Sequence, residues 1–109
     1  MAISLSFKVD GKMKTFKKDD IYFSDNIRAV KHSIVQTEFY TKENATKEDY
    51  ENMQTDYCEM IADIFGNEFS ADQLKNGLTI GKLDELESIY LKALGGEKKE
   101  TDESEKKKK

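Results

Sequence analysis

The 109 residues are enough for one domain with a modest core and too few for two ordinary domains. Charged and apolar residues each make up 37% of the chain and the formal net charge is −4, which predicts a soluble protein and argues against a broad phosphate-binding surface. No run approaches the roughly 20 apolar residues that cross a bilayer, so a membrane protein is excluded.

Two residue counts bear on structure and compartment. Proline is absent, and because proline most often interrupts helices, long helices are permitted. Cys58 is the single cysteine and cannot form an internal disulfide, and no secretory leader pattern opens the chain. We therefore expect a reducing, cytoplasmic compartment.

The chain opens with a predicted β-hairpin. Apolar residues alternate with Ser and Lys from Ile3 to Val9, the period of a half-buried strand. Asp10-Gly11 is a strong two-residue turn signal, because both residues accept positive φ. The returning strand is predicted to run through about Phe16 as an edge, and its lysines leave the register open.

Two longer helices are predicted next. Ser24 is the expected N-cap of a helix over about 25 to 40, and Thr46 with Asp49 resembles a capping box that starts a second helix. Apolar residues at three- and four-residue spacing predict the buried stripes. In the first helix these are Ile27, Val30, Ile34 and Val35; in the second they are Tyr50, Met53, Tyr57, Met60, Ile61, Ile64 and Phe65.

The last elements are a short helix and an amphipathic helix. Gly66-Asn67 is expected to end the second helix, and Ser70 with Gln73 predicts a capped short helix that ends near Gly77. The final helix carries the stripe Leu83, Leu86, Ile89, Tyr90, Ala93 and Leu94, and Gly95-Gly96 closes it.

The sum of these elements is a mainly α fold: a small N-terminal β-hairpin followed by a compact bundle of about four helices. We expect one helical domain with its hairpin over residues 1–95. From Glu97 onward no apolar residue occurs, so residues 96–109 are predicted to form a disordered, charged C-terminal tail.

Little in the sequence indicates catalysis or ligand chemistry. His32 is the only histidine and is expected at the surface or its boundary, while Cys58 beside the second stripe is better explained as a small buried hydrophobe than as a reactive thiol. No spacing matches a phosphate-binding loop or a metal site. We predict no catalytic, cofactor-binding or metal-binding residues, and no enzymatic activity.

The aromatic residues point to a protein interface. Eleven rings in a small chain are more than one modest core needs, and exposed aromatics favour protein interfaces. The predicted partner-binding residues are Phe39, Tyr40, Tyr57, Tyr90 and Leu91. The alternative that these side chains simply complete the core is left open.

Two stretches carry a family resemblance. Residues 3–16 are similar to the "strand, Asp-Gly-Lys, lysine-rich strand, Thr-Phe" start of the tail assembly chaperones of siphophages that infect Gram-positive hosts. Residues 65–78, from Phe65-Gly66-Asn67 to Gly77-Leu78, resemble the central passage of that family. The stretch from 23 to 45 and Thr79-Ile80-Gly81 depart from the family pattern.

The resemblance implies a specific role. A tail assembly chaperone coats the long tape measure protein, keeps its apolar helices soluble and recruits tail tube subunits in the host cytoplasm, and the mature virion lacks it. The resemblance also implies a homo-oligomer and, through ribosomal frameshifting near the lysine-rich end, a longer product.

The alternative is a small DNA-binding regulatory protein with a helix-turn-helix-like pair around residues 65–77. The excess of acid over base from Ala71 to Leu94 counts against it. We therefore expect no nucleic-acid partner.

Overall fold

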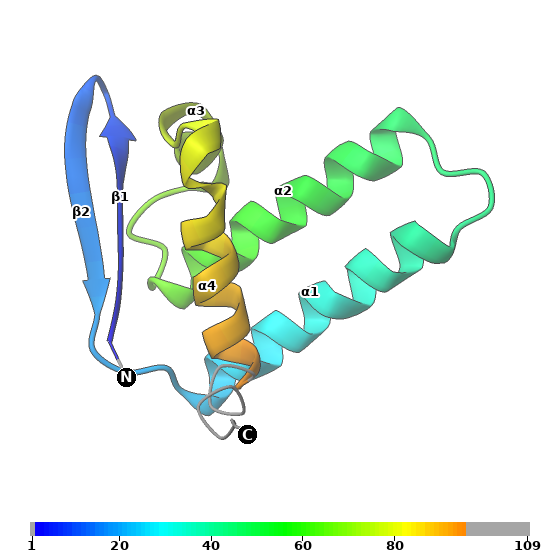
Figure 1. Cartoon of the computed structure of the whole chain (residues 1–109), viewed down its shortest axis with the longest axis horizontal. Helices are drawn as coiled ribbons and strands as arrows, with labels where there is room; N and C mark the ends of the chain where they lie inside the picture. The colour runs from blue at the N-terminus through cyan, green and yellow to red at the C-terminus, as the bar shows by residue number, and fades with distance from the viewer. Residues whose placement is uncertain (1, 96–109) are drawn as a thin grey trace, which may run out of the picture.

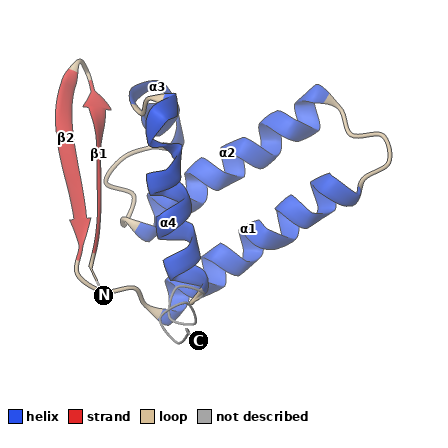
Figure 2. Ribbon diagram, viewed as in Figure 1, coloured by secondary structure: helices blue, strands red, loops and turns tan. Residues whose placement is uncertain are grey.

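The computed structural model describes residues 2–95, in which a two-stranded hairpin is followed by four helices (Figures 1 and 2). The strands are β1 (Ile3–Val9) and β2 (Lys12–Lys18), and the helices are α1 (Phe23–Thr41), α2 (Lys47–Ile64), α3 (Ala71–Gly77) and α4 (Leu83–Leu94). A single 3₁₀ turn, Ile80–Lys82, precedes α4. The predicted mainly α fold class is confirmed, while the predicted tail at 96–109 lies outside the described residues.

The hairpin has a defined register. Asp10 and Gly11 both have positive φ, at 55° and 81°, and form the two-residue turn that pairs Val9 with Lys12 and Leu5 with Phe16. The second strand therefore continues to Lys18, two residues past its predicted end. Alternate residues of β1 are buried against the helices, and Phe16 joins them from β2.

The hydrophobic core lies between the inner face of the hairpin and the helices. The C-terminal half of α2 supplies Met60, Ile61 and Ile64, and Phe69, Leu74 and Leu86 follow from the next segments. The Phe7 ring contacts Phe69 edge-on, with 4.9 Å between ring centroids. Aromatic packing thus joins β1 to the connection between α2 and α3.

The helix starts agree with two of the three predicted caps. Thr46 caps α2 and Ser70 caps α3, each through a side-chain oxygen that accepts from the third helical residue. The prediction of Ser24 as the cap of α1 was wrong, because the Asp25 carboxylate accepts from the backbone N–H of Tyr22 at 2.9 Å. That bond makes Tyr22 the N-cap and starts the helix at Phe23.

A larger correction concerns the face that α1 turns to the core. Of the predicted stripe, Ile27, Val30 and Ile34 are exposed and Val35 is half-buried, whereas the buried residues of α1 are Asp25, Ala29 and His32. The prediction counted only apolar side chains, whereas polar contacts to α2, α4 and β2 hold the opposite face inward. His32 is thus 2% exposed rather than a surface or boundary residue.

The arrangement of the helices leaves part of the long pair open. α1 and α2 run antiparallel, and α4 crosses the pair near its base, so that the outer turns of α1 and α2 project past α4 (Figure 1). Tyr40 and Tyr50 lie on this outer part and are exposed. Tyr50 therefore does not belong to the buried stripe predicted for α2.

Candidate functional site

Polar contacts fix the position of α1 on the rest of the molecule. Lys18 Nζ donates to the Asp25 carboxylate at 2.6 Å and to the Ile64 carbonyl at 2.8 Å, which ties β2, α1 and the end of α2 together. A cation is also favourable at the carbonyl end of a helix. In the first turn of α1, the side-chain amide of Asn26 also donates to the Ala93 carbonyl of α4 at 2.9 Å.

A charged network continues along the same face of α1. Arg28 donates to the Asp56 and Asp63 carboxylates of α2, each at 2.8 Å, and Asp56 also contacts His32 Nδ1 at 2.9 Å. Burial raises the pKa of Asp56, but the hydrogen bonds from Arg28 and His32 outweigh it and hold the pKa below its ordinary value. The network keeps His32 directed toward α2.

An aromatic cluster forms next to this network. The His32 ring stacks on Tyr57 with centroids 5.0 Å apart, and the edge of Tyr90 approaches both rings, at 5.5 Å from His32 and 5.7 Å from Tyr57. Burial, together with the charge of Glu87, raises the pKa of Tyr57 well above its ordinary value, so its phenol stays neutral. Three helices contribute one ring each.

This cluster lines an open groove of about 410 Å³ between the outer part of the α1–α2 pair and α4. Its walls carry Tyr40 and Gln36 from α1, Met53 and Cys58 from α2, and Leu83 and Leu91 from α4. Glu87 is the charged residue on the lining. The groove is therefore largely apolar and aromatic, with an acidic group at its edge.

The structure brings together four of the five residues predicted to bind a partner. Tyr40, Tyr57, Tyr90 and Leu91 all line the groove, and Tyr40 and Leu91 are exposed in it. Phe39 does not join them. Its ring contacts Tyr40 at 5.1 Å and Tyr50 at 5.8 Å between ring centroids, and it lines a separate hollow of about 260 Å³ between α1 and α2.

Several lining residues escaped the sequence analysis. His32 and Gln36 precede the predicted Tyr40 at four-residue spacing, which places all three on one face of α1, and this spacing was the signal that could have found the other two. Leu83 was assigned to the core stripe of the last helix but is exposed at the groove. No pattern local to one helix predicts that the three faces meet.

The groove lining contains one thiol, and its surroundings do not activate it. Burial raises the pKa of the Cys58 thiol, Glu59 adds to that rise and Lys75 opposes it, so the thiol is a poor nucleophile. Within residues 2–95, no three His, Cys, Asp or Glu side chains are placed to hold a metal ion. Over the same stretch, no helix is both long and apolar enough to cross a membrane.

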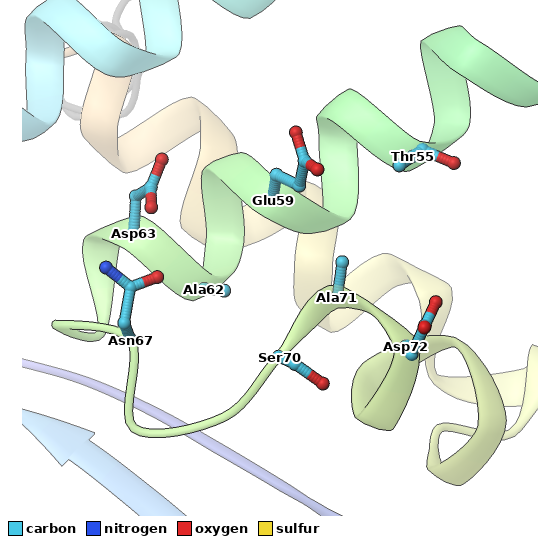
Figure 3. A pocket seen from close by; sticks show the side chains of 8 residues that line it. All are labelled: Thr55, Glu59, Ala62, Asp63, Asn67, Ser70, Ala71 and Asp72. Atoms are coloured by element: carbon cyan, nitrogen blue, oxygen red, sulfur yellow. The ribbon is translucent and has the colours of Figure 1, made fainter.

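A second hollow, of about 440 Å³, lies between α2 and α3 and is polar (Figure 3). Glu59 and Asp63 come from α2 and Asp72 comes from α3, with Ser70 and Asn67 from the connection between them. Asp63 already pairs with Arg28 at 2.8 Å. The hollow has no apolar surface comparable to that of the aromatic groove.

The helix pair that DNA binding would use is acidic in the structure. α3 exposes Asp72 and Lys75, which balance, and the first two turns of α4 expose Asp84, Glu85 and Glu87. Affinity for nucleic acid rests on clustered Lys and Arg, and this helix pair has no such cluster. The pair therefore does not favour the alternative of a small DNA-binding regulatory protein.

Fold and groove together define a small helical protein with an N-terminal hairpin and an open aromatic surface of the kind that contacts other polypeptides. The family model described as phage tail chaperone protein matches residues 1–109, so the chain belongs to the phage tail chaperone family. No curated protein and no solved structure matches the chain.

Proposed function

We propose that this phage tail chaperone coats the tape measure protein by holding one of its apolar helices in the aromatic groove between the α1–α2 pair and α4. The observation that carries the proposal is the meeting of Tyr40, Tyr57, Tyr90 and Leu91 in one open groove. An amphipathic helix in a hydrophobic groove is a recurrent mode of recognition. It requires no catalytic step.

The charges around the groove indicate the chemistry of the bound helix. Glu87 lies on the lining, and Asp84 and Glu85 are exposed on the same helix. A client helix with an apolar stripe flanked by Lys or Arg complements this edge, while a helix flanked by carboxylates is repelled. Binding should therefore weaken as salt concentration rises, because the charges at the edge are screened.

Other parts of the proposal rest on family membership. Several copies associate along the tape measure protein, recruit tail tube subunits around it in the cytoplasm of a Gram-positive host, and leave before the virion is complete. A longer product made by frameshifting belongs to the same proposal. If the gene has no slippery heptamer and no overlapping downstream frame, the proposal of a longer frameshifted product is wrong.

Co-expression with the tape measure protein of the same phage tests the groove. The wild-type chain is expected to keep the tape measure protein soluble, with many copies per client in size-exclusion chromatography with light scattering. Tyr40→Asp and Leu91→Asp place a carboxylate on the apolar wall at exposed positions, so the chain should stay folded and lose the client. Tyr50→Asp is the matched control, because Tyr50 is an exposed tyrosine that is not part of the groove lining.

Two outcomes decide the proposal. Loss of the soluble complex with the groove variants, and its retention with the control, supports the groove as the client site. A soluble complex with both groove variants present in the same chain contradicts it.

A further inference from the structure

The hairpin concentrates positive charge in a chain that is otherwise acidic. Residues 1–18 contain five lysines and one aspartate, a net charge of +4, which leaves −8 for residues 19–109 because the whole chain carries −4. Lys12 and Lys14 of β2 are exposed, and neither forms an ion pair within residues 2–95. These two lysines therefore add charge to the surface without holding the fold together.

The outer edge of β2 is open. The sheet has two strands, so β2 pairs with β1 on one side, and no helix of the described chain comes alongside its other side (Figure 1). The two-residue turn makes the flanking Val9 and Lys12 a hydrogen-bonded pair. Such pairs alternate with pairs that exchange no bonds, so the backbone N–H and C=O groups that point away from β1 belong to Met13, Thr15 and Lys17.

The two faces of β2 differ in chemistry. Successive side chains of a strand alternate between faces, so Lys12 and Lys14 follow each other on one face and Met13 and Thr15 on the other. A strand added along this edge would place every second side chain beside a lysine and the others beside Met13 and Thr15. Carboxylates at the first set of positions and β-branched side chains at the second complement the edge.

We propose that the outer edge of β2 binds, as a third strand, an extended segment of a second protein in which carboxylates alternate with β-branched residues. Main-chain hydrogen bonds supply the affinity, and Lys12 and Lys14 select an acidic segment over a basic one. The hairpin and the outer part of the α1–α2 pair lie on opposite sides of α4, so the edge and the aromatic groove can be occupied together (Figure 1). The inference therefore goes beyond the client site proposed above.

The charge of the edge decides against other occupants. Two copies joined through β2 would set lysines of one strand against lysines of the other, and like charges opposed across strands are destabilising. The same lysines attract a strand with carboxylates at the opposed positions. Nucleic acid would contact the lysines, but it offers no ladder of alternating donors and acceptors to the strand edge.

Binding of a synthetic peptide to the full chain tests the proposal. The probe is the acetylated peptide Thr-Val-Glu-Val-Glu-Val-Thr, and Thr-Val-Lys-Val-Lys-Val-Thr is its matched control. In amide NMR titrations up to about 1 mM peptide, which cover weak affinities, the acidic peptide is expected to shift the signals of Met13, Thr15 and Lys17, and the lysine peptide is not. Binding of the acidic peptide should weaken as salt concentration rises.

Charge reversal tests the selection by the lysines. Lys12→Glu with Lys14→Glu should raise the dissociation constant of the acidic peptide at least about tenfold, because two opposite-charge pairs become like-charge pairs. The lysine peptide should then bind better than the acidic one. Lys31→Glu with Lys47→Glu is the control, since it changes the net charge equally at exposed positions of α1 and α2.

Proline at Thr15 tests the main-chain hydrogen bonds. Thr15→Pro removes one N–H that points away from β1, a change that edge strands tolerate, and should weaken binding of the acidic peptide. Thr15→Val keeps the N–H and is the matched control, since both variants lose the contact between the Thr15 and Ser6 hydroxyls. The amide signals of β1 report whether the hairpin is intact, and the lysine variants carry the test if proline disrupts it.

Several results would overturn the proposal. Among these are the absence of any shift up to about 1 mM peptide and equal binding of the two peptides by the wild-type chain. Tighter binding of a short single-stranded DNA at the same amides would assign the lysines to nucleic acid. Protection of the Met13, Thr15 and Lys17 amides from hydrogen exchange in the chain alone would mean that a segment of this chain already covers the edge.

The peptide titrations need no tape measure protein, so their failure differs from failure of the groove. If no peptide binds while the groove variants still lose the tape measure protein, the proposal for the edge falls and the client site stands. If Lys12→Glu with Lys14→Glu loses the tape measure protein in co-expression, the hairpin belongs to the client site and the proposal of a second protein is wrong.

Discussion

Replacing Gly77 by alanine tests the closest approach between a helix and the hairpin. Gly77 is the last residue of α3, and its backbone lies against β1. A Cβ atom added there would stand 1.9 Å from the Lys8 carbonyl oxygen and 3.0 Å from a ring carbon of Phe7. The obstacle is the backbone of a paired strand, which cannot move aside as the end of a flexible side chain can.

The expected loss of stability follows from that geometry. Close carbon–oxygen contacts in proteins are about 3.3–3.6 Å, so α3 and β1 must separate by well over 1 Å. Overpacking of a core by added carbon atoms costs about 1–3 kcal/mol, and the higher helix propensity of alanine offsets up to about 1 kcal/mol. We expect a net loss of about 2 kcal/mol, or about 8–16 °C in Tm for a domain of this size.

Thermal and urea unfolding followed by far-UV circular dichroism measure this difference. Gly81→Ala is the matched control, because nothing lies within 4 Å of a Cβ added at Gly81, and its stability should stay within about 0.5 kcal/mol of wild type. If Gly77→Ala were as stable as Gly81→Ala, the reasoning from the close contact would be refuted.

Three further stability changes are expected in urea unfolding. Asp56→Asn should cost about 1–3 kcal/mol at neutral pH by weakening the bond to Arg28. Folding lowers the pKa of Asp56, so the ionised carboxylate stabilises the folded state above its unfolded pKa of about 4, and this stabilisation is lost as the pH falls through the folded pKa. The Asp56→Asn variant should therefore lose less stability in acid than wild type does. Ser70→Ala removes the cap of α3 and should cost about 1 kcal/mol, and an unchanged midpoint would argue against that cap. Lys18→Met leaves the buried Asp25 carboxylate without its cation and should cost about 2 kcal/mol, whereas a neutral or stabilising effect would show that the pair contributes nothing.

Local signals in the sequence predicted the elements well. The alternation from Ile3 to Val9, the Asp10-Gly11 turn and the caps at Thr46 and Ser70 each depend on residues a few positions apart, and the structure has all of them. The glycine that ends α4 has the left-handed φ expected of it. The phage tail chaperone family was also predicted correctly from residues 3–16 and 65–78.

What failed depends on contacts between distant residues. The orientation of α1 is set by Arg28 reaching Asp56 and Asp63 on α2, and an apolar count along α1 alone pointed the helix the wrong way. For the same reason His32 was placed near the surface although it is buried against Tyr57 and Tyr90. The sequence predicted which aromatic residues bind a partner but not that they line one groove, because the walls of the groove come from three different helices.

The hydrogen bond from Asn26 to the Ala93 carbonyl fixes the end of the molecule at which α4 terminates. It holds the end of α4 beside the first turn of α1, while the connection between α1 and α2 begins about 22 Å away along α1 (Figure 1). Gly95, the C-cap of α4, therefore lies at the same end of the molecule as the first turn of α1, opposite the connection between α1 and α2.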